Sequence, residues 1–577
     1  MTHRWEVATD GPAEGARGSG LARRVLWARG YRGEEDAREF LEPRLTRLHE
    51  PSLLAGVDEA AELVLGAARG GKRIAIYGDY DVDGVSGTAI LWRVLRAVAP
   101  EAEVRTYIPH RLEEGYGVNE EALRGLRAEG VELVVTVDCG ITGLAAARVA
   151  RELGMGYVVT DHHEMASELP CADVVAHPRV RNARTGEVYP FGDLCGAGVA
   201  FKLAWRIATL SEGGERVRGD VREVLLDCLA LASLGTVADV VPLVDENRVI
   251  ARFGLSRVGK SGIEGLSALV EASGLGKGRV DAEGVGFMMA PRLNAAGRMG
   301  HAREALELLT TAEGDRAWDI ARALTTMNDE RKRTERKIYE EADAAAVAAG
   351  MCADDRRAIV LAGEEWHAGV LGIVCSRLVE RRRRPTILMR RENGECHGSG
   401  RSVDGLDLHE GLRACADLLV GFGGHAMAAG VRVKASRLEE FVERFTGWVN
   451  ERMGMEDLEP RMRVDCEAGL EEMSIREVEE LERLGPFGRG NPGVRVVVKG
   501  MELASRPETM GANGKHLALM VRRGGKVMRC VGWNWGEKRD ALRAGMEIAM
   551  VVEPKVSRWG SRVSVEPVLK DVCVTRG

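Results

Sequence analysis

Three aspartates stand on alternate positions directly after an apolar segment in the first part of the chain. Residues 74–77 read IAIY, which is typical of a buried strand, and GDYDVDG follows with Asp79, Asp81 and Asp83. Carboxylates this close together repel one another strongly unless a cation cancels their charge. Mg²⁺ and Mn²⁺ prefer oxygen ligands of this kind. The motif therefore predicts half of a divalent metal site, with an ordinary Asp/Gly turn after a strand as the alternative.

Two further apolar segments end in polar side chains, and a fourth candidate follows a helix. Residues 131–137 run into Asp138, and residues 156–160 run into DHH, which contains His162 and His163. Asp239 comes after a long helical pattern over residues 221–234. A lone Asp in that place more often caps a helix or closes a turn, so only the other motifs make Asp239 a candidate ligand.

The segments between these motifs have helical periodicity, over residues 85–98, 120–129 and 144–153. Alternating strands and helices predict right-handed crossovers and a parallel sheet. The carboxyl ends of such strands lie along one edge, which is where ligands bind in this class of fold. We therefore expect these side chains to converge in space: Asp79, Asp81, Asp83, Asp138, His162 and His163.

In chain order, GDYDVDG, VDCG, DHH and GTVADVVPL resemble the four signature motifs of the DHH phosphoesterase superfamily. The segments LCGAGVAFKL, PRLNAAGRMGHA, GSGRS and GFGGHAMAAG are similar to those of its RecJ-like branch, whose members are 5′→3′ exonucleases specific for single strands. The resemblance extends over nearly the whole chain. A bare DHH string recurs by chance, whereas four motifs in the correct order at element ends form a specific signal.

The resemblance implies a pair of Mn²⁺ or Mg²⁺ ions a few Å apart, with Asp138 bridging them. Asp79 and Asp81 would hold one ion, and Asp83, His162 and Asp239 would hold the other. Asp138 and His163 are the predicted catalytic residues, with His163 acting on the scissile phosphate or the leaving oxygen; a structural hydrogen bond is the alternative for His163. Asp161 is expected to orient a ligand.

An exonuclease needs a feature that recognises the end of a strand. GSGRS offers close approach to the backbone, together with Ser399 and an arginine, Arg401, that suits bidentate phosphate contact. Arg111, after YIPH, is expected to reach in from the core, so that the two segments hold a 5′-phosphate. In the alternative interpretation, GSGRS is a flexible turn and Arg111 is a surface salt-bridge partner.

Four further residues are expected to bind substrate. His425 lies in a glycine-rich bend, and a helix starting at the small residues 426–429 would offer free N–H groups to an anion. The resemblance makes His425 a phosphate contact, although a histidine in such a turn is usually structural. Arg292, Asn294 and Arg298 are predicted to contact the backbone of the strand, and they are equally suited to tying a loop to the core.

The predicted fold class is α/β, and the chain is predicted to divide into four structural segments. They are a parallel-sheet catalytic core with a helical appendage at residues 21–314, a linking helix at 315–348, a smaller α/β region at 353–450, and short strands at 458–577. The third resembles the DHH-associated domain, and the fourth resembles a β-barrel of the OB type that binds nucleic acid.

Composition agrees with this organisation. Of the 577 residues, 45% are hydrophobic, and the eleven cysteines form no C-x-x-C pair, which argues against a zinc ribbon or a disulfide framework. The net charge of −7 divides into +6 over residues 501–577 and −13 over the rest, so a basic module follows an acidic body. No segment has the length and apolar character needed to cross a bilayer, and the first residues are polar. We therefore expect a cytoplasmic protein without membrane contact.

The predicted function is metal-dependent hydrolysis of single-stranded DNA to mononucleotides, in the 5′→3′ direction, in DNA repair and recombination. The resemblance suggests a single-strand-binding protein and a helicase as partners. Related phosphodiesterases that cleave short oligonucleotides or cyclic dinucleotides are the first alternative, and pyrophosphatases are another, but their chains are typically shorter and lack a basic module. A non-enzymatic scaffold is disfavoured because every expected acidic and histidine position is present.

Overall fold

The structure is a computed structural model that describes residues 3–8, 20–111, 113–214, 216–217, 219–276, 280–559 and 562–576. The chain divides into two compact units. The larger unit comprises Arg44–Leu458 and Gly488–Gly490, and the smaller one comprises Glu459–Phe487, Asn491–Gly577 and the described part of Met1–Pro43. Within the described residues, no helix is both long enough and apolar enough to span a membrane.

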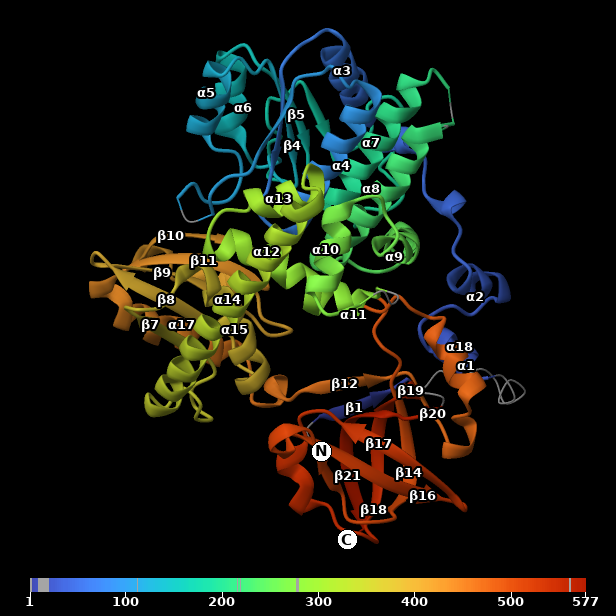
Figure 1. The fold of residues 1–577 in the computed structure, drawn as a ribbon. Helices are drawn as coiled ribbons and strands as arrows, with labels where there is room; N and C mark the ends of the chain where they lie inside the picture. The colour runs from blue at the N-terminus through green and yellow to red at the C-terminus, as the bar shows by residue number, and fades with distance from the viewer. Residues whose placement is uncertain are drawn as a thin grey trace. The chain divides into compact units, whose positions relative to one another are not determined.

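Five parallel strands form the central sheet of the larger unit, in the order β3-β2-β4-β5-β6. Figure 1 labels its strands β4 and β5. Their bounds are β2 (Ile74–Gly78), β3 (Val104–Tyr107), β4 (Leu133–Val137), β5 (Gly156–Thr160) and β6 (Val174–Ala176). All residues of β2 and β4 are buried, which explains why these segments are continuously apolar rather than alternating. The predicted parallel sheet is confirmed.

Helices cover both faces of this sheet. They are α3 (Val57–Arg69), α4 (Val82–Val98), α5 (Glu120–Ala128), α6 (Leu144–Glu152), α7 (Gly196–Ser211) and α8 (Gly219–Ala238). Ile74 and Ile76 of β2 share a buried cluster with α3, α4, α7 and α8, whereas Ala75 and Tyr77 share another with α5 and α6. The alternate side chains of one strand thus anchor two helical layers.

The order in which strands are added to the sheet reverses between β2 and β4. It passes from β2 to β3 at the edge and returns to β4 on the other side of β2. The backbone N–H of Asp79 donates to Val137 O at 3.2 Å, and that of Asp138 donates to Thr160 O at 3.0 Å. The residues that follow the strands are therefore at one level, at a topological switch point where such folds bind ligands.

A helical appendage and a long helix follow the core. The elements are α9 (Asp245–Val258), α10 (Glu264–Ala272), α11 (Ala282–Gly284), the π-helical turn η4 (Val285–Met289), α12 (Ala290–Met299), α13 (Arg303–Thr310) and α14 (Gly314–Ala348). The 35-residue helix α14 spans the segment for which a linking helix is predicted. One face of it is buried, through residues that include Ile320, Leu324 and Ile338.

A second five-stranded sheet, in the order β10-β11-β9-β8-β7, completes the larger unit. Its elements are β7 (Ile359–Gly363), α15 (Ala368–Arg382), β8 (Thr386–Glu392), β9 (Glu395–Arg401), α16 (Leu408–Arg413), β10 (Leu419–Gly424), β11 (Ala428–Lys434) and α17 (Leu438–Arg452). Strands β10 and β11 form a hairpin, in which His425 N donates to Ala428 O at 2.8 Å. The expectation of a helix starting at the small residues 426–429 is therefore wrong. This segment leads into β11, which pairs with β10 in a hairpin at the edge of the sheet.

The smaller unit is built on a barrel closed by β14, β18, β21, β17 and β16, since β16 also pairs with β14. Its elements are β12 (Arg461–Val464), β13 (Cys466–Glu467), α18 (Ile475–Glu482), β14 (Val496–Leu503), β15 (Glu508–Met510), β16 (His516–Arg523), β17 (Lys526–Gly532), β18 (Glu547–Glu553), β19 (Val556–Trp559), β20 (Arg562–Val565) and β21 (Val568–Arg576). The predicted C-terminal barrel is confirmed.

The amino-terminal elements also belong to the smaller unit. Strand β1 (Arg4–Val7) pairs with β12, and α1 (Leu21–Ala28) and α2 (Glu34–Leu41) pack into the same core as the barrel. Arg29 forms a bidentate ion pair with Asp465, at 2.9 and 3.0 Å. The structure thus differs from the expectation that the catalytic core begins at residue 21. Residues 21–43 pack instead with the barrel, which lies more than 400 residues further along the chain, so sequence order does not reveal this boundary.

Candidate metal centre and substrate site

One strand end and two helix N-termini position the three aspartates of GDYDVDG. Asp79 is buried at the end of β2, and Asp81 caps α4 by accepting hydrogen bonds from the N–H groups of Asp83 and Gly84, at 2.9 and 3.2 Å. Asp83 accepts hydrogen bonds from the N–H groups of Gly196 and Ala197 at the start of α7, at 2.6 and 2.9 Å. Free N–H groups and helix dipoles thus stabilise two of the three carboxylates.

Asp138 occupies a strained position at the end of β4. Its φ of 63° lies in the left-handed region, which few residues other than glycine adopt. A Cβ on Gly196 would lie only 2.5 Å from the Cβ of Asp138, so the start of α7 must be glycine here. Strain of this kind persists where the surroundings enforce it, and it concentrates at functional sites.

Asp161 holds the turn that carries the two histidines. Its Oδ1 accepts hydrogen bonds from the N–H groups of His162 and His163, at 2.7 and 3.2 Å, and lies 2.8 Å from His163 Nδ1. Its Oδ2 accepts a hydrogen bond from Ile141 N at 2.9 Å. The buried carboxylate therefore holds the backbone of both histidines and orients the ring of His163, as expected of a residue that supports metal ligands.

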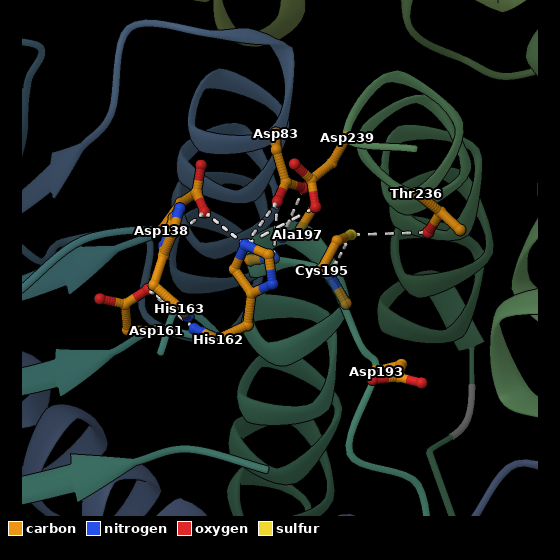
Figure 2. A network of polar contacts seen from close by, with 12 residues as sticks. Asp83, Asp138, Asp161, His162, His163, Asp193, Cys195, Ala197, Thr236 and Asp239 are labelled. Atoms are coloured by element: carbon orange, nitrogen blue, oxygen red, sulfur yellow. Dashed lines mark hydrogen bonds and ion pairs between the residues drawn. The ribbon is translucent and has the colours of Figure 1, made fainter. Parts of the chain in front are cut away.

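The structure brings all six expected metal ligands together. His162 Nε2 lies 3.1 Å from Asp138 Oδ1, 3.7 Å from Asp239 Oδ2 and 3.8 Å from Asp83 Oδ2, and Figure 2 shows these carboxylates around the imidazole. Three groups have ligand atoms within 4.8 Å of one another: Asp79, Asp81 and Asp138; Asp83, His162 and Asp239; and Asp138, His162 and His163. The first group joins Asp138 to the two other ligands expected for one ion, and the second contains the three ligands expected for the other ion, without Asp138.

The chemistry of these donors fits divalent cations. Within the described part of the chain, Asp79 Oδ1, Asp138 Oδ1 and His162 Nε2 are buried and have no hydrogen-bond partner. Buried polar atoms are rarely left unpaired, because each one costs free energy, and a bound cation would satisfy all three. Burial and neighbouring carboxylates raise the pKa of Asp79 and Asp138 well above the usual range, whereas burial lowers the pKa of His162 and keeps its ring neutral for coordination.

His163 is in a different state from His162. Burial disfavours its charged form, but the hydrogen bond and charge of Asp161 prevail, with help from Asp239, and raise the pKa of His163 to about 9. The ring is therefore a cation at neutral pH. The hydroxyl of Tyr116 lies 3.1 Å from His163 Nδ1 and donates to Asp138 O at 3.3 Å. Sequence reasoning missed Tyr116; its only signal is an aromatic residue between two glycines.

Three of the arginines predicted to bind substrate gather beside the carboxylates. The guanidinium of Arg111 lies 4.8 Å from the centre of the Tyr80 ring. Burial, followed by the charges of Arg111, Arg331 and Arg401, lowers the pKa of Arg298 to about 10, so the charges of these arginines act on one another. Arg111 makes no ion pair with any described residue, which argues against the surface salt-bridge interpretation. The cluster is suited to an anion.

GSGRS forms part of strand β9, so the interpretation as a flexible turn is wrong. A Cβ on Gly398 would lie 2.1 Å from Leu388 O, and one on Gly400 would lie 2.8 Å from a Leu408 methyl carbon. Neighbouring protein atoms therefore fill the space that a side chain at either glycine would need. Ser399 and Arg401 alternate with them and lie on the face of β9 that packs near α15, where Arg401 approaches Gly372.

The other residues predicted to bind substrate, which are Arg292, Asn294 and His425, are not part of this arginine cluster. Arg292 donates to Met288 O and to Thr325 Oγ1, at 2.5 and 3.1 Å. Asn294 Oδ1 accepts a hydrogen bond from Val82 N at 3.1 Å. Both side chains thus tie the appendage to its surroundings, which is the alternative considered for them. His425 is exposed, with its Nδ1 3.4 Å from Glu164 Oε2.

Comparison with known proteins finds families that match the parallel sheet, the second sheet and the barrel. The sequence matches the DHH family, N-terminal domain, over residues 73–233, the DHHA1 domain over residues 355–451, and the RecJ OB domain over residues 464–571. The first match covers the parallel sheet and five of the six candidate metal ligands. These matches define a DHH-type protein with an associated domain and a barrel.

Full-length relatives narrow the assignment further. The chain is 38% identical over 557 residues to the single-stranded-DNA-specific exonuclease RecJ of Bacillus subtilis, covering 96% of this chain and 68% of that one. Crystal structures of RecJ from Thermus thermophilus in complex with Mn²⁺ and with Mg²⁺ match with TM-scores of 0.82 and 0.75, at 31% and 30% identity, and cover 100% of this chain and 80% and 79% of those chains. The chain belongs to the RecJ family.

Metal affinity is expected to depend on pH because ligands must lose protons before they bind a cation. Burial, then the charges of Asp83 and Asp81, raise the pKa of Asp239 to about 8. Below this pH the proton competes with the cation, so Mn²⁺ affinity should rise as pH increases through about 8, by up to about tenfold per unit for each proton released. Calorimetric titration of the metal-free protein with Mn²⁺ at pH 6.5 to 8.5 would measure this.

Asp239→Asn is the matched control, because an amide oxygen remains but the titrating proton is gone. This variant should bind Mn²⁺ more weakly and with a flatter dependence on pH. An affinity of the native protein that stays constant across the range would contradict the assignment of Asp239 as a ligand.

Proposed function

We propose that this chain is a metal-dependent exonuclease that hydrolyses single-stranded DNA to mononucleotides in the 5′→3′ direction. The observation that carries the proposal is the pair of ligand groups, Asp79/Asp81/Asp138 and Asp83/His162/Asp239, which share one site at a sheet edge. The names of the relatives, single-stranded-DNA-specific exonuclease, supply the substrate class. The barrel and its basic charge support binding of nucleic acid.

Two cations in these groups would lower the pKa of a bound water from about 15.7 toward about 7 and stabilise the attacking and leaving oxygens. The protein itself fixes the ligands through the helix N-termini at Asp81 and Asp83 and through the strained backbone at Asp138. His163, held as a cation by Asp161, is placed to donate to a phosphate oxygen or to the leaving oxygen. No covalent nucleophile is required.

The direction of degradation is proposed to come from the cluster of Arg111, Arg298 and Arg401. A terminal 5′-phosphate carries more negative charge than an internal phosphodiester and presents more oxygens, so converging guanidinium groups favour it. The charges of Asp81 and Asp79 interact with Arg298 and Arg111 respectively, which supports a terminus bound near the metal centre.

Arg401→Ala should remove most of the preference for a 5′-phosphorylated strand over a 5′-hydroxyl strand. A charged hydrogen bond contributes about 1.5–3 kcal/mol, so KM for the phosphorylated strand should rise about 10- to 100-fold. Steady-state kinetics on matched oligonucleotides with each terminus would measure the change. Arg381→Ala, an exposed arginine at the end of α15, is the control. Equal rates on the two strands with the native protein would refute the phosphate pocket.

A polarity assay tests the proposed function as a whole. Single-stranded and duplex DNA labelled at either end would be incubated with Mn²⁺ or Mg²⁺, and mononucleotides should appear from the 5′ end of single strands. Cleavage restricted to very short oligonucleotides or cyclic dinucleotides would favour the related phosphodiesterases instead. We further propose a cytoplasmic role in DNA repair and recombination, with a single-strand-binding protein and a helicase as partners.

A further inference from the structure

The glycine-rich segment before the barrel contains a tripeptide that belongs structurally to the larger unit. Gly488–Gly490 lies in the compact unit of the metal centre, while the residues on either side of it lie in the other unit. The backbone O of Arg489 accepts a hydrogen bond from Leu243 N at 2.7 Å. Leu243 is only four residues beyond the candidate ligand Asp239, so the tripeptide is anchored at the edge of the site.

The two glycines make this contact possible. A Cβ on Gly488 would lie 2.8 Å from a Leu243 methyl carbon, and one on Gly490 would lie 3.0 Å from Pro242 Cβ. Gly490 also has a φ of +74°, which larger residues rarely adopt. The two glycines therefore allow the Gly-Arg-Gly backbone to pack closely on Pro242 and Leu243. Arg489 is the only residue of the tripeptide with a side chain.

That side chain is a cation with no partner inside the protein. Arg489 is exposed, and its guanidinium makes no hydrogen bond or ion pair with any residue that the structure describes. Its charge nevertheless acts on Asp239, whose pKa it lowers against the larger effects of burial and of the neighbouring carboxylates Asp83 and Asp81. An unpaired arginine at a metal centre that handles phosphates is available to an anion from outside.

We propose that Arg489 is a substrate-binding residue of the metal site, where its guanidinium contacts a backbone phosphate of the bound single strand. This inference rests on the proposed function, and it adds to the site a residue from a segment far from the four motifs. The contact is sequence-independent because it is made to phosphate. The tripeptide is fixed for this role by its packing on Pro242 and Leu243 of the fourth motif.

Equilibrium binding tests the proposal without requiring hydrolysis. A fluorescein-labelled, 5′-phosphorylated oligo-dT would be titrated with the full-length Asp138→Asn protein, with and without Arg489→Ala, over a range of salt concentrations. Loss of one phosphate contact should weaken binding about tenfold at low salt and reduce the slope of log K against log[salt] by about 0.7. Arg489→Lys should keep the slope of the parent protein.

Two controls separate phosphate contact from a structural role. Arg381→Ala removes an exposed arginine outside the site and should change neither affinity nor slope. Calorimetric Mn²⁺ titration of Arg489→Ala in the otherwise native protein, at a pH above the pKa of Asp239, should give a metal affinity no weaker than the native one, because only a repelling cation is lost. Binding of DNA with the parent affinity and slope, or weakened Mn²⁺ affinity with an unchanged salt slope, would overturn the inference. Failure of the native protein to degrade DNA would overturn only the proposed function.

Discussion

Asp138→Ala is expected to abolish metal-dependent cleavage while leaving binding of single strands largely intact. Asp138 belongs to two of the three potential ligand groups, and its Oδ1 is a buried atom with no hydrogen-bond partner. Removing a residue that merely orients a metal ligand already costs about 10- to 100-fold, so loss of the carboxylate proposed to bridge both ions should lower kcat by more than about 10³-fold. Release of mononucleotides from a 5′-labelled single strand in Mn²⁺ would measure it.

The control for Asp138→Ala must keep the local backbone, because Asp138 has a positive φ that alanine tolerates poorly. Asp138→Asn is suitable, since asparagine adopts this conformation more readily and keeps one oxygen. It should retain the fold and bind oligo-dT, yet remain severely impaired in cleavage. Turnover at more than a tenth of the native rate by either variant would rule out Asp138 as a bridge between two ions.

Lys202→Met is expected to produce a large loss of stability in the larger unit. Lys202 and Glu246 form an ion pair in which both side chains are fully buried. Glu246 also accepts hydrogen bonds from the Tyr189 hydroxyl and from His49 N, at 2.5 and 2.7 Å. Removing the lysine leaves a buried carboxylate without its cation, which typically costs about 3–5 kcal/mol. Urea denaturation followed by tryptophan fluorescence would report it, since the ring centre of Trp205 is 5.3 Å from Lys202 Nζ.

Two further variants identify the cause of that loss. Lys202→Met combined with Glu246→Gln should recover part of the stability, because the uncompensated charge is gone while an acceptor remains. Lys499→Met removes an exposed partner of Glu467, at 2.6 Å, and should cost no more than about 1 kcal/mol. A cost of under about 1 kcal/mol for Lys202→Met would show that the pair contributes little beyond its packing.

Local patterns were sufficient to predict the parallel sheet and the convergence of candidate ligands at its edge. Strand and helix periodicity are properties of short segments, so alternation of apolar strands and amphipathic helices identified a parallel sheet from residues 74–160 alone. Because parallel strands end at a common edge, Asp79, Asp138 and His162 were predicted to converge, and their side chains do meet. The barrel was predicted from short strands together with resemblance, and it is present.

Other features arose only from contacts between distant segments. Asp83 is held by the start of α7, more than 100 residues away, and the left-handed backbone of Asp138 leaves no mark on the sequence. The hairpin at His425 forms because β11 has a partner on each side, which composition alone did not reveal.

The amino-terminal helices and Arg489 show the same limit most clearly. Residues 21–43 pack with the barrel, although the catalytic core follows them in the sequence. Gly488–Gly490 packs with the catalytic unit, although barrel-unit residues flank it on both sides. The sequence by itself determined which residues could bind cations and which strands carry them, because those signals are local. Only the tertiary structure decided which neighbours surround each ligand, because burial, charge and close packing depend on segments that meet after folding.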